Sequence, residues 1–388
     1  MASPLPVPRF LVLDSLRGIC AVMVVLFHLK ATGAITQLAL VRNSWLLVDF
    51  FFVLSGFVIA TGYQDRLGQG FPLRRFMFLR LARVYPLHLF VLLLFVAFET
   101  LKLFHAFPGL SMRPAFASPR SVPEFWENLF LVQIFGLRDN DSWNAPAWSI
   151  AAEVWTYLLA GLVFVYLRKL VLPVATVTVI VALATLAVTG NGHLDRTFTM
   201  ALVRCLFGFS CGVIACSLYR RFGPLPGGTA LEIATAAVVI LFVTFASGYA
   251  TLAAPFVFFG AVLVFASERG RVSAGLRWQP FVLLGTLSYS IYMVHTFVQA
   301  RCVDALLLAS RYTGVELGHV TVLDSGPTKL AGAKGAAWIG DVLTIAIVAI
   351  CIAAAWFTFH WVEEPFRKWS KRRVKAAVAR AEQAPVSF

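Results

Sequence analysis

Ten segments of mostly apolar residues divide this chain of 388 residues, and they constrain its fold more than any other feature. A helix needs roughly 20 such residues to cross the hydrocarbon core of a bilayer. Charged residues make up only 13% of the chain, whereas a soluble domain is about a quarter charged. Long runs rich in Leu, Val, Ala and Phe favour helices over the alternating strands of a barrel. The sequence therefore predicts an all-α, polytopic membrane protein with spans near 15–36, 45–63, 85–106, 147–167, 170–189, 198–218, 231–247, 249–266, 282–308 and 338–360.

Basic residues are distributed unevenly between the segments that connect these spans. With the N-terminus inside, the inner segments hold 20 Lys and Arg and the outer segments hold 9. Because cytoplasmic loops are enriched in these residues, both termini are predicted to be cytoplasmic. The same rule accounts for the net charge of +14, so we expect no nucleic-acid partner. The transmembrane domain is placed at 1–365, and the basic tail at 366–388 is expected to lie on the anionic inner leaflet.

Patterns that hold a metal or a permanently bound cofactor are absent from the sequence. The six cysteines all fall inside apolar segments, and none forms a CxxC pair. We interpret them as small buried hydrophobic residues rather than as disulfides or metal ligands. The sequence also contains no HExxH, Walker or GxSxG motif. We therefore expect neither a metal site nor a resident cofactor.

Ionisable residues inside a span are costly, so each is a candidate functional residue. Arg17 and His28 are eleven residues apart in the first span. This spacing is three helical turns, which returns to the same face about 16 Å away. It predicts that both line one channel, with Arg17 at the cytoplasmic mouth and His28 near the middle of the membrane. Asp14 precedes Arg17 by three residues, which favours an ion pair. The structural alternative is an interfacial ion pair and a histidine bonded to a neighbouring helix.

Three further candidates lie beside the third span and within the fourth. Arg80 and Arg83, in the cytoplasmic loop predicted before the third span, share one helical face and carry guanidinium groups suited to phosphates. The alternative for both is the ordinary enrichment of cytoplasmic loops in basic residues. Glu153 lies about two turns into the fourth span, where a carboxylate can accept a proton or orient a histidine. Its alternative is a structural hydrogen bond to a neighbouring helix.

Weaker candidates are polar residues in apolar surroundings. Tyr292 and His295 follow Ser288 at helical spacing and form one polar stripe in the ninth span. Ser55 lies beside a glycine, where small residues first indicate helix packing. Trp148 and Ser149 belong to the same stretch as Glu153. We retain the following as supporting residues: Asp14, Ser55, Trp148, Ser149, Tyr292 and His295.

The chain resembles the acyltransferase-3 family of integral-membrane O-acyltransferases in six segments distributed over its whole length. They are LDSLRGICAVMVVLFH (13–28), DFFFVLSGFVI (49–59), RFMFLRLARVYP (75–86), PAWSIAAEVWTY (146–157), LGTLSYSIYMVH (284–295) and HWVEEPFRKW (360–369). The resemblance implies transfer of an acyl group, usually acetyl from cytoplasmic acetyl-CoA, to a hydroxyl of a carbohydrate or lipid-linked glycan. The chain is similar to the stand-alone form of the family, without a C-terminal hydrolase-like domain.

The resemblance also implies roles for individual residues. The residues that match the family's motifs are Arg17, His28, Arg80, Arg83 and Glu153. Many members carry a second glutamate beside the last of these, where this chain has Val154. A paired-carboxylate mechanism is therefore not implied for this chain.

The expected chemistry follows from the three phosphate groups of CoA. The three arginines would form a cationic mouth for the donor, and the acyl thioester would reach His28. His28 would act as general base to the acceptor hydroxyl, which we favour, or as a transient acyl carrier. Glu153 would orient its imidazole ring. The long outer loops at 107–146 and 309–337 would help to admit the acceptor, since long loops in compact folds are often functional.

Two other classes of function fit part of the sequence. A transporter or flippase also has polar residues in its spans, but that class predicts inverted repeats and broken helices, which we do not find in the sequence. A non-catalytic membrane scaffold would leave His28 and Glu153 dispensable. Within the enzyme class, the alternative acceptor is a small hydrophobic molecule. The favoured hypothesis remains a bacterial inner-membrane acyltransferase whose partners are membrane lipid, acyl-CoA and a glycan acceptor.

Overall fold

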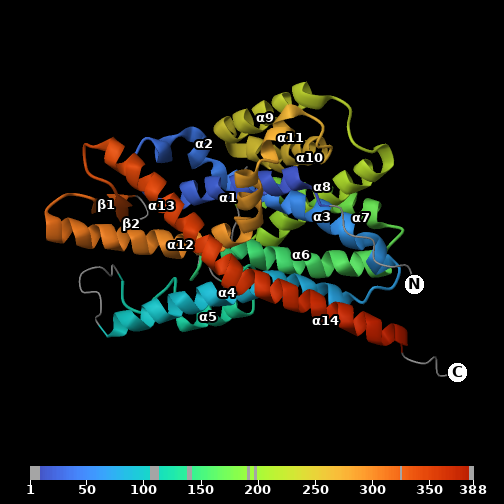
Figure 1. Ribbon diagram of the computed structural model, residues 1–388, viewed down its shortest axis with the longest axis horizontal. Helices are drawn as coiled ribbons and strands as arrows, with labels where there is room; N and C mark the ends of the chain where they lie inside the picture. Colours follow the sequence, from blue (N-terminus) through green and yellow to red (C-terminus); the bar gives the residue numbers. More distant parts are fainter. Residues whose placement is uncertain are drawn as a thin grey trace.

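The protein, described here by a computed structural model, is almost entirely helical (Figure 1). The structure describes residues 9–104, 113–137, 142–189, 193–195, 199–323 and 326–383. Within these residues, ten helices are long and apolar enough to cross a membrane, which confirms the predicted all-α polytopic class. They are α1 (Leu11–His28), α3 (Leu47–Gly68), α4 (Leu73–Leu103), α6 (Ala147–Tyr166), α7 (Val171–Thr189), α8 (Ala201–Phe222), α9 (Gly228–Phe245), α10 (Ala254–Phe265) with the preceding turn η3 (Gly248–Ala253), α12 (Gln279–Thr313) and α13 (Ala337–Thr358).

Short elements connect these helices. They are η1 (Ile35–Gln37), α2 (Ala39–Arg42), η2 (Ser44–Leu46), α5 (Val122–Leu129) and α11 (Arg271–Leu276). The segment at 309–337, predicted to be an outer loop, also contains an antiparallel hairpin of β1 (Gly318–Leu323) and β2 (Gly326–Ala331), which was not predicted from the sequence. Its β-branched residues, such as Val320 and Thr321, favour a strand. In Figure 1 the hairpin lies at one end of the long axis, opposite the far end of the C-terminal helix.

Three of the predicted segments differ from the observed helices. The first span, expected near 15–36, ends at His28 because Leu29 adopts an extended backbone. The third, expected near 85–106, begins as α4 at Leu73, directly after Pro72, and continues through Pro86. Arg80 and Arg83 therefore lie in a helix and not in a loop. The last span continues through the π-helical turn η4 (Phe359–Glu363) into α14 (Glu364–Gln383), so the basic tail is helical.

Helices α1, α4 and α12 lie together and run in the same direction. In their N-terminal halves, Gly18 of α1 lies against Gly285 of α12, and Val84 of α4 bonds to Tyr289 of α12. Closer to the C-terminal ends, His28 of α1 meets His295, and Phe95 of α4 meets Phe297. The N-terminal halves of the three helices therefore face one region of the molecule and their C-terminal halves face another. This arrangement positions the two cavities described below.

A glycine pair sets the separation of α1 and α12. A Cβ atom at Gly285 would lie 2.4 Å from the carbonyl oxygen of Asp14, and one at Gly18 would lie 2.4 Å from the backbone nitrogen of Gly285. Small residues at such positions let two helix backbones approach closely in a membrane. The same approach allows Arg17 to reach the carbonyl oxygen of Gly285.

We expect Gly285→Ala to destabilise the protein because its methyl group would push two backbones apart. Overpacking of this kind costs about 3 kcal/mol. Thermal unfolding of the purified protein in detergent measures the effect. The matched control is Gly260→Ala, where an added Cβ meets no atom within 4 Å. Equal melting temperatures for the two variants would contradict the assigned contact.

Candidate active site

A first cavity lies between the N-terminal halves of α1, α4, α12, α3 and α6. Its empty volume is about 780 Å³. Its polar lining residues are Arg17, Ser55, Arg80, Arg83, Ser149, Glu153, Tyr157, Ser288, Tyr289 and Tyr292. The structure thus brings together seven of the residues singled out in the sequence, from five helices that are far apart in the chain.

Arg17 is held at the edge of this cavity by α12. Its Nε donates to Ser288 Oγ at 2.8 Å, and its Nη2 donates to the carbonyl oxygen of Gly285 at 3.1 Å. Nη2 also lies 2.9 Å from Oδ1 of Asp14, which confirms the predicted ion pair. Asp14 pairs with Arg9 as well, at 3.2 Å. The role that the structure gives Asp14 is therefore to position Arg17.

Arg80 and Arg83 project from α4 into the same cavity. The guanidinium of Arg80 lies 4.9 Å from the ring centroid of Tyr63, and its Nη2 donates to the Tyr63 hydroxyl at 3.1 Å. Arg83 forms no hydrogen bond or ion pair with any residue that the structure describes. Guanidinium groups without a carboxylate partner in a partly enclosed cavity are suited to bind an anion such as phosphate.

Glu153 belongs to this cavity and not to the surroundings of His28. Its Oε1 accepts hydrogen bonds from Ser55 Oγ at 2.5 Å and from the hydroxyl of Tyr157. The predicted contact between Glu153 and His28 is therefore wrong, because α6 faces the first cavity whereas His28 ends α1. Tyr157 was not among the candidates predicted from the sequence. Its spacing of four residues from Glu153 was the signal that could have found it.

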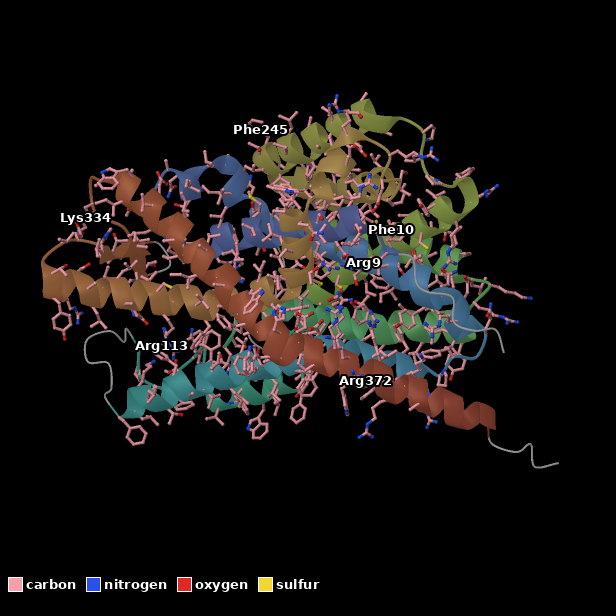
Figure 2. The ribbon with its side chains drawn as sticks, in the orientation of Figure 1. Arg9, Phe10, Arg113, Phe245, Lys334 and Arg372 are labelled. Atoms are coloured by element: carbon pink, nitrogen blue, oxygen red, sulfur yellow. The ribbon has the colours of Figure 1, made fainter. Side chains whose placement is uncertain are left out.

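A second, larger cavity lies between the C-terminal halves of α1, α4 and α12 and residues of the connecting segments 113–120 and 327–329. Its empty volume is about 1380 Å³. Its polar lining residues are His28, Lys30, Lys102, Arg113, Arg120, Thr296, Gln299, Arg301, Asp304, Thr328 and Lys329. Arg17 and His28 therefore line different cavities, and the predicted single channel through both is not observed. Figure 2 shows Arg113 and Lys334 toward one end of the long axis, well away from Arg9 and Arg372.

The imidazole of His28 has a defined tautomer. Its Nδ1 lies 2.9 Å from the carbonyl oxygen of Val24. A carbonyl oxygen can only accept, so Nδ1 carries the hydrogen and Nε2 carries the lone pair. His28 lines the second cavity and is only partly buried. The ring can therefore accept a proton at Nε2, as a general base must.

His295 and Tyr292 lie between the two cavities. The His295 ring is fully buried, and its centroid is 5.0 Å from that of His28. Its Nδ1 donates to the Tyr292 carbonyl oxygen at 2.8 Å, and its Nε2 has no hydrogen-bond partner among the described residues. The Tyr292 hydroxyl lies 2.8 Å from Ser149 Oγ in the first cavity. The predicted polar stripe on α12 is confirmed, and it runs from the first cavity to the ring of His28, which lines the second.

Trp148 is not among the described residues that line either cavity. Its ring lies 5.3 Å from the guanidinium of Arg204, which is buried and paired with Asp49. The structure therefore gives Trp148 a packing role beside a buried ion pair. Within the described residues, no group of three His, Cys, Asp or Glu side chains could hold a metal ion.

Comparison with known proteins supplies the family. A family model described as an acyltransferase domain, of the acyltransferase-3 type, matches residues 10–356. Protein 2 in the picA locus of Rhizobium radiobacter is 37% identical over 94 residues, which cover 24% of this chain and 47% of that protein. The chain thus spans about half the length of this curated relative, and no solved structure matches it. Because the family model covers most of the chain and both cavities, the protein belongs to the acyltransferase-3 family of integral-membrane O-acyltransferases.

Proposed function

We propose that the protein transfers an acyl group, acetyl in the simplest case, from cytoplasmic acyl-CoA to a carbohydrate hydroxyl. The acceptor would be a surface polysaccharide or its lipid-linked precursor, and the location the bacterial inner membrane. One observation carries the proposal. Three arginines line a cavity at one end of the α1, α4 and α12 bundle, and a histidine suited to general base catalysis lines a cavity toward the other end.

The first cavity is the proposed donor site. Arg17, Arg80 and Arg83 would bind phosphate groups of CoA, which enters and leaves as a co-substrate. These residues lie in the N-terminal halves of their helices, the halves that the positive-inside rule assigns to the cytoplasm. Since Glu153 accepts hydrogen bonds from Ser55 and Tyr157, we assign it to positioning these two hydroxyls beside the donor.

The second cavity is the proposed acceptor site. His28 Nε2 would take the proton of the acceptor hydroxyl as its oxygen attacks the thioester carbonyl carbon. The carbon–sulfur bond then breaks, and the CoA thiolate takes up a proton as it leaves. The thioester must pass Tyr292 and His295 to reach His28, so these two side chains would line its path. Direct transfer needs no acyl-histidine intermediate.

Arg83→Gln provides the test of the donor site. The assay follows transfer of labelled acetyl from acetyl-CoA, supplied to the cytoplasmic face of inverted vesicles, into extracted glycan and lipid. Loss of a charge-assisted contact to phosphate should raise KM for acetyl-CoA about 30-fold, equivalent to ~2 kcal/mol, with little change in kcat. Arg74→Gln is the matched control, because Arg74 is exposed on the same helix and does not line the cavity.

The competing function is a transporter or flippase that carries out no acyl transfer. It predicts that wild-type protein neither binds acetyl-CoA nor cleaves its thioester with any acceptor. Equal KM values for the Arg83 and Arg74 variants would show that Arg83 does not bind the donor. Thioester cleavage that depends on Arg83 would exclude the transporter.

A further inference from the structure

We propose that the second cavity binds an anionic group, a phosphate or carboxylate, on the carbohydrate acceptor, and so selects charged acceptors over neutral ones. Its role in acceptor selection rests on the proposed function, whereas anion binding can be tested without it. The cavity is formed by elements from most of the chain length. Its six basic lining residues are Lys30, Lys102, Arg113, Arg120, Arg301 and Lys329.

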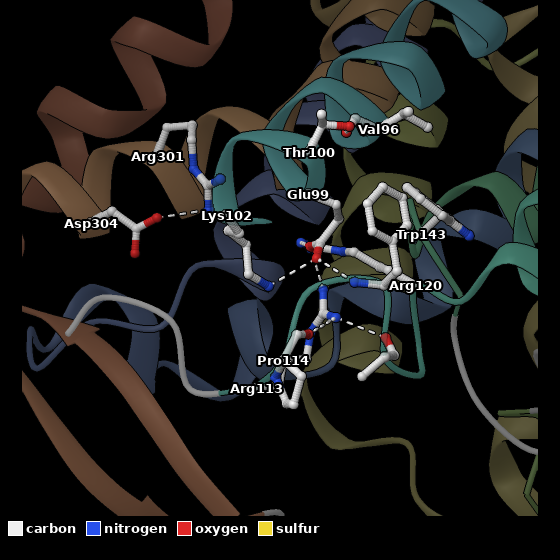
Figure 3. A network of polar contacts seen from close by, with 12 residues as sticks. Val96, Glu99, Thr100, Lys102, Arg113, Pro114, Arg120, Trp143, Arg301 and Asp304 are labelled. Carbon is white, nitrogen blue, oxygen red and sulfur yellow. Dashed lines mark hydrogen bonds and ion pairs between the residues drawn. The ribbon is translucent and has the colours of Figure 1, made fainter. Parts of the chain in front are cut away.

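One buried carboxylate forms ion pairs with three of these cations. Glu99 is fully buried. Figure 3 shows its carboxylate at the centre of the polar network. It accepts from Lys102 Nζ at 2.8 Å, from Arg113 Nη2 at 2.5 Å and from Arg120 Nη1 at 3.1 Å. Burial and the neighbouring Arg113 lower the pKa of Arg120. Three cations therefore converge on one buried carboxylate, where water screens charges poorly.

Arg301 contributes hydrogen-bond donors to the proposed anion site. Its guanidinium lies against the ring of Phe98, and its Nη2 is 2.7 Å from Oδ2 of Asp304. Its Nε and Nη1 are buried and have no hydrogen-bond partner among the described residues. Buried donors without acceptors are rare in proteins and indicate a missing group. An oxyanion would satisfy donors of this kind through short, charge-assisted bonds.

Positively charged side chains predominate in the lining of the whole cavity. Asp304 is shared between Arg301 and Lys329. Among the described residues that line the cavity, six are basic and one, Asp304, is acidic, and Lys30 has no described partner. Such an excess costs folding free energy in a site for a neutral sugar. It is useful in a site that must hold an anion.

The position of His28 connects this anion site to the proposed reaction. His28 lines the same cavity as Arg301 and Lys30, so an acceptor anchored through its anionic group would hold a hydroxyl near His28 Nε2. The CoA phosphates have their own arginines in the first cavity, which Tyr292 and His295 separate from the second. The anion of the second cavity therefore belongs to the acceptor.

Equilibrium dialysis of matched chromophores tests the inference without acetyl-CoA. The full chain is placed in nanodiscs of zwitterionic lipid, and the probes are 4-nitrophenyl β-glucoside, its 6-phosphate and 4-nitrophenyl β-glucuronide. We expect an anionic probe to bind about tenfold or more tightly than the neutral glucoside. The phosphate and carboxylate probes distinguish the two sources of charge. Lys30→Gln should weaken binding of the anionic probe about fivefold and leave the neutral probe unchanged.

Lys334→Gln is the matched control, because Lys334 is an exposed outer-loop lysine that does not line the cavity. Equal binding of neutral and anionic probes overturns the inference, as does displacement of the anionic probe by adenosine 3′,5′-bisphosphate at concentrations that saturate the donor site. Acetyl transfer at equal rates to neutral and anionic acceptors overturns it while leaving the proposed function intact. Selective anion binding that depends on Lys30, without acetyl transfer to any acceptor, supports the anion site and removes the proposed function.

Discussion

His28→Ala is expected to lower kcat for acetyl transfer about a thousandfold, the middle of the range for loss of a general base. The reason is the position and tautomer of the imidazole. Nδ1 donates to the Val24 carbonyl oxygen, so the lone pair of Nε2 is available to the acceptor in the second cavity. KM for acetyl-CoA should change little, because the arginines line the first cavity. Initial rates with labelled acetyl-CoA separate the two constants.

The control for this variant is His360→Ala. His360 is exposed at the end of the last span and lines neither cavity, so its loss should leave both constants near their wild-type values. Equal kcat values for the two variants would remove His28 from the chemical step. A raised KM for acetyl-CoA with unchanged kcat would mean that His28 binds the donor. It would also mean that the second cavity takes no part in the chemical step.

Asp49→Ala is expected to destabilise the protein by about 3–5 kcal/mol, the cost of leaving a buried charge without its partner. Asp49 in α3 accepts from Arg204 Nη2 at 2.7 Å and from its Nε at 3.0 Å. Both side chains are almost fully buried, and the rings of Trp45 and Trp148 each lie 5.3 Å from the guanidinium. Asp195 is 56% exposed and 3.5 Å away, so it replaces little of the lost attraction.

Unfolding in detergent by heat or denaturant measures this effect. The matched control is Asp65→Ala, which removes the exposed partner of Arg220 on the same pair of helices and should cost less than about 1 kcal/mol. The double variant Asp49→Leu with Arg204→Met should recover most of the stability, because it removes both charges together. A single variant as stable as the control would mean that Arg204 finds another partner.

The helical class, the number of spans and most of the polar lining of the first cavity could be predicted from the sequence. Span length and apolar content are local properties, and they fully determine whether a segment can cross a bilayer. The stripe from Ser288 to His295 was predictable for the same reason, since helical spacing alone puts these residues on one face. The start of α4 was not, because its first turns carry arginines that resemble a cytoplasmic loop.

Contacts between helices were decided only by the tertiary structure. Glu153 pairs with Tyr157 and Ser55 because α3 and α6 turn these residues toward one cavity. The basic second cavity combines the C-terminal halves of three helices with residues of two connecting segments, and no local pattern connects Lys30 to Arg120 or Lys329. Only folding brings these basic residues and His28 to the lining of one cavity. The sequence by itself determined which residues are polar within the membrane, whereas helix packing determined which of them meet.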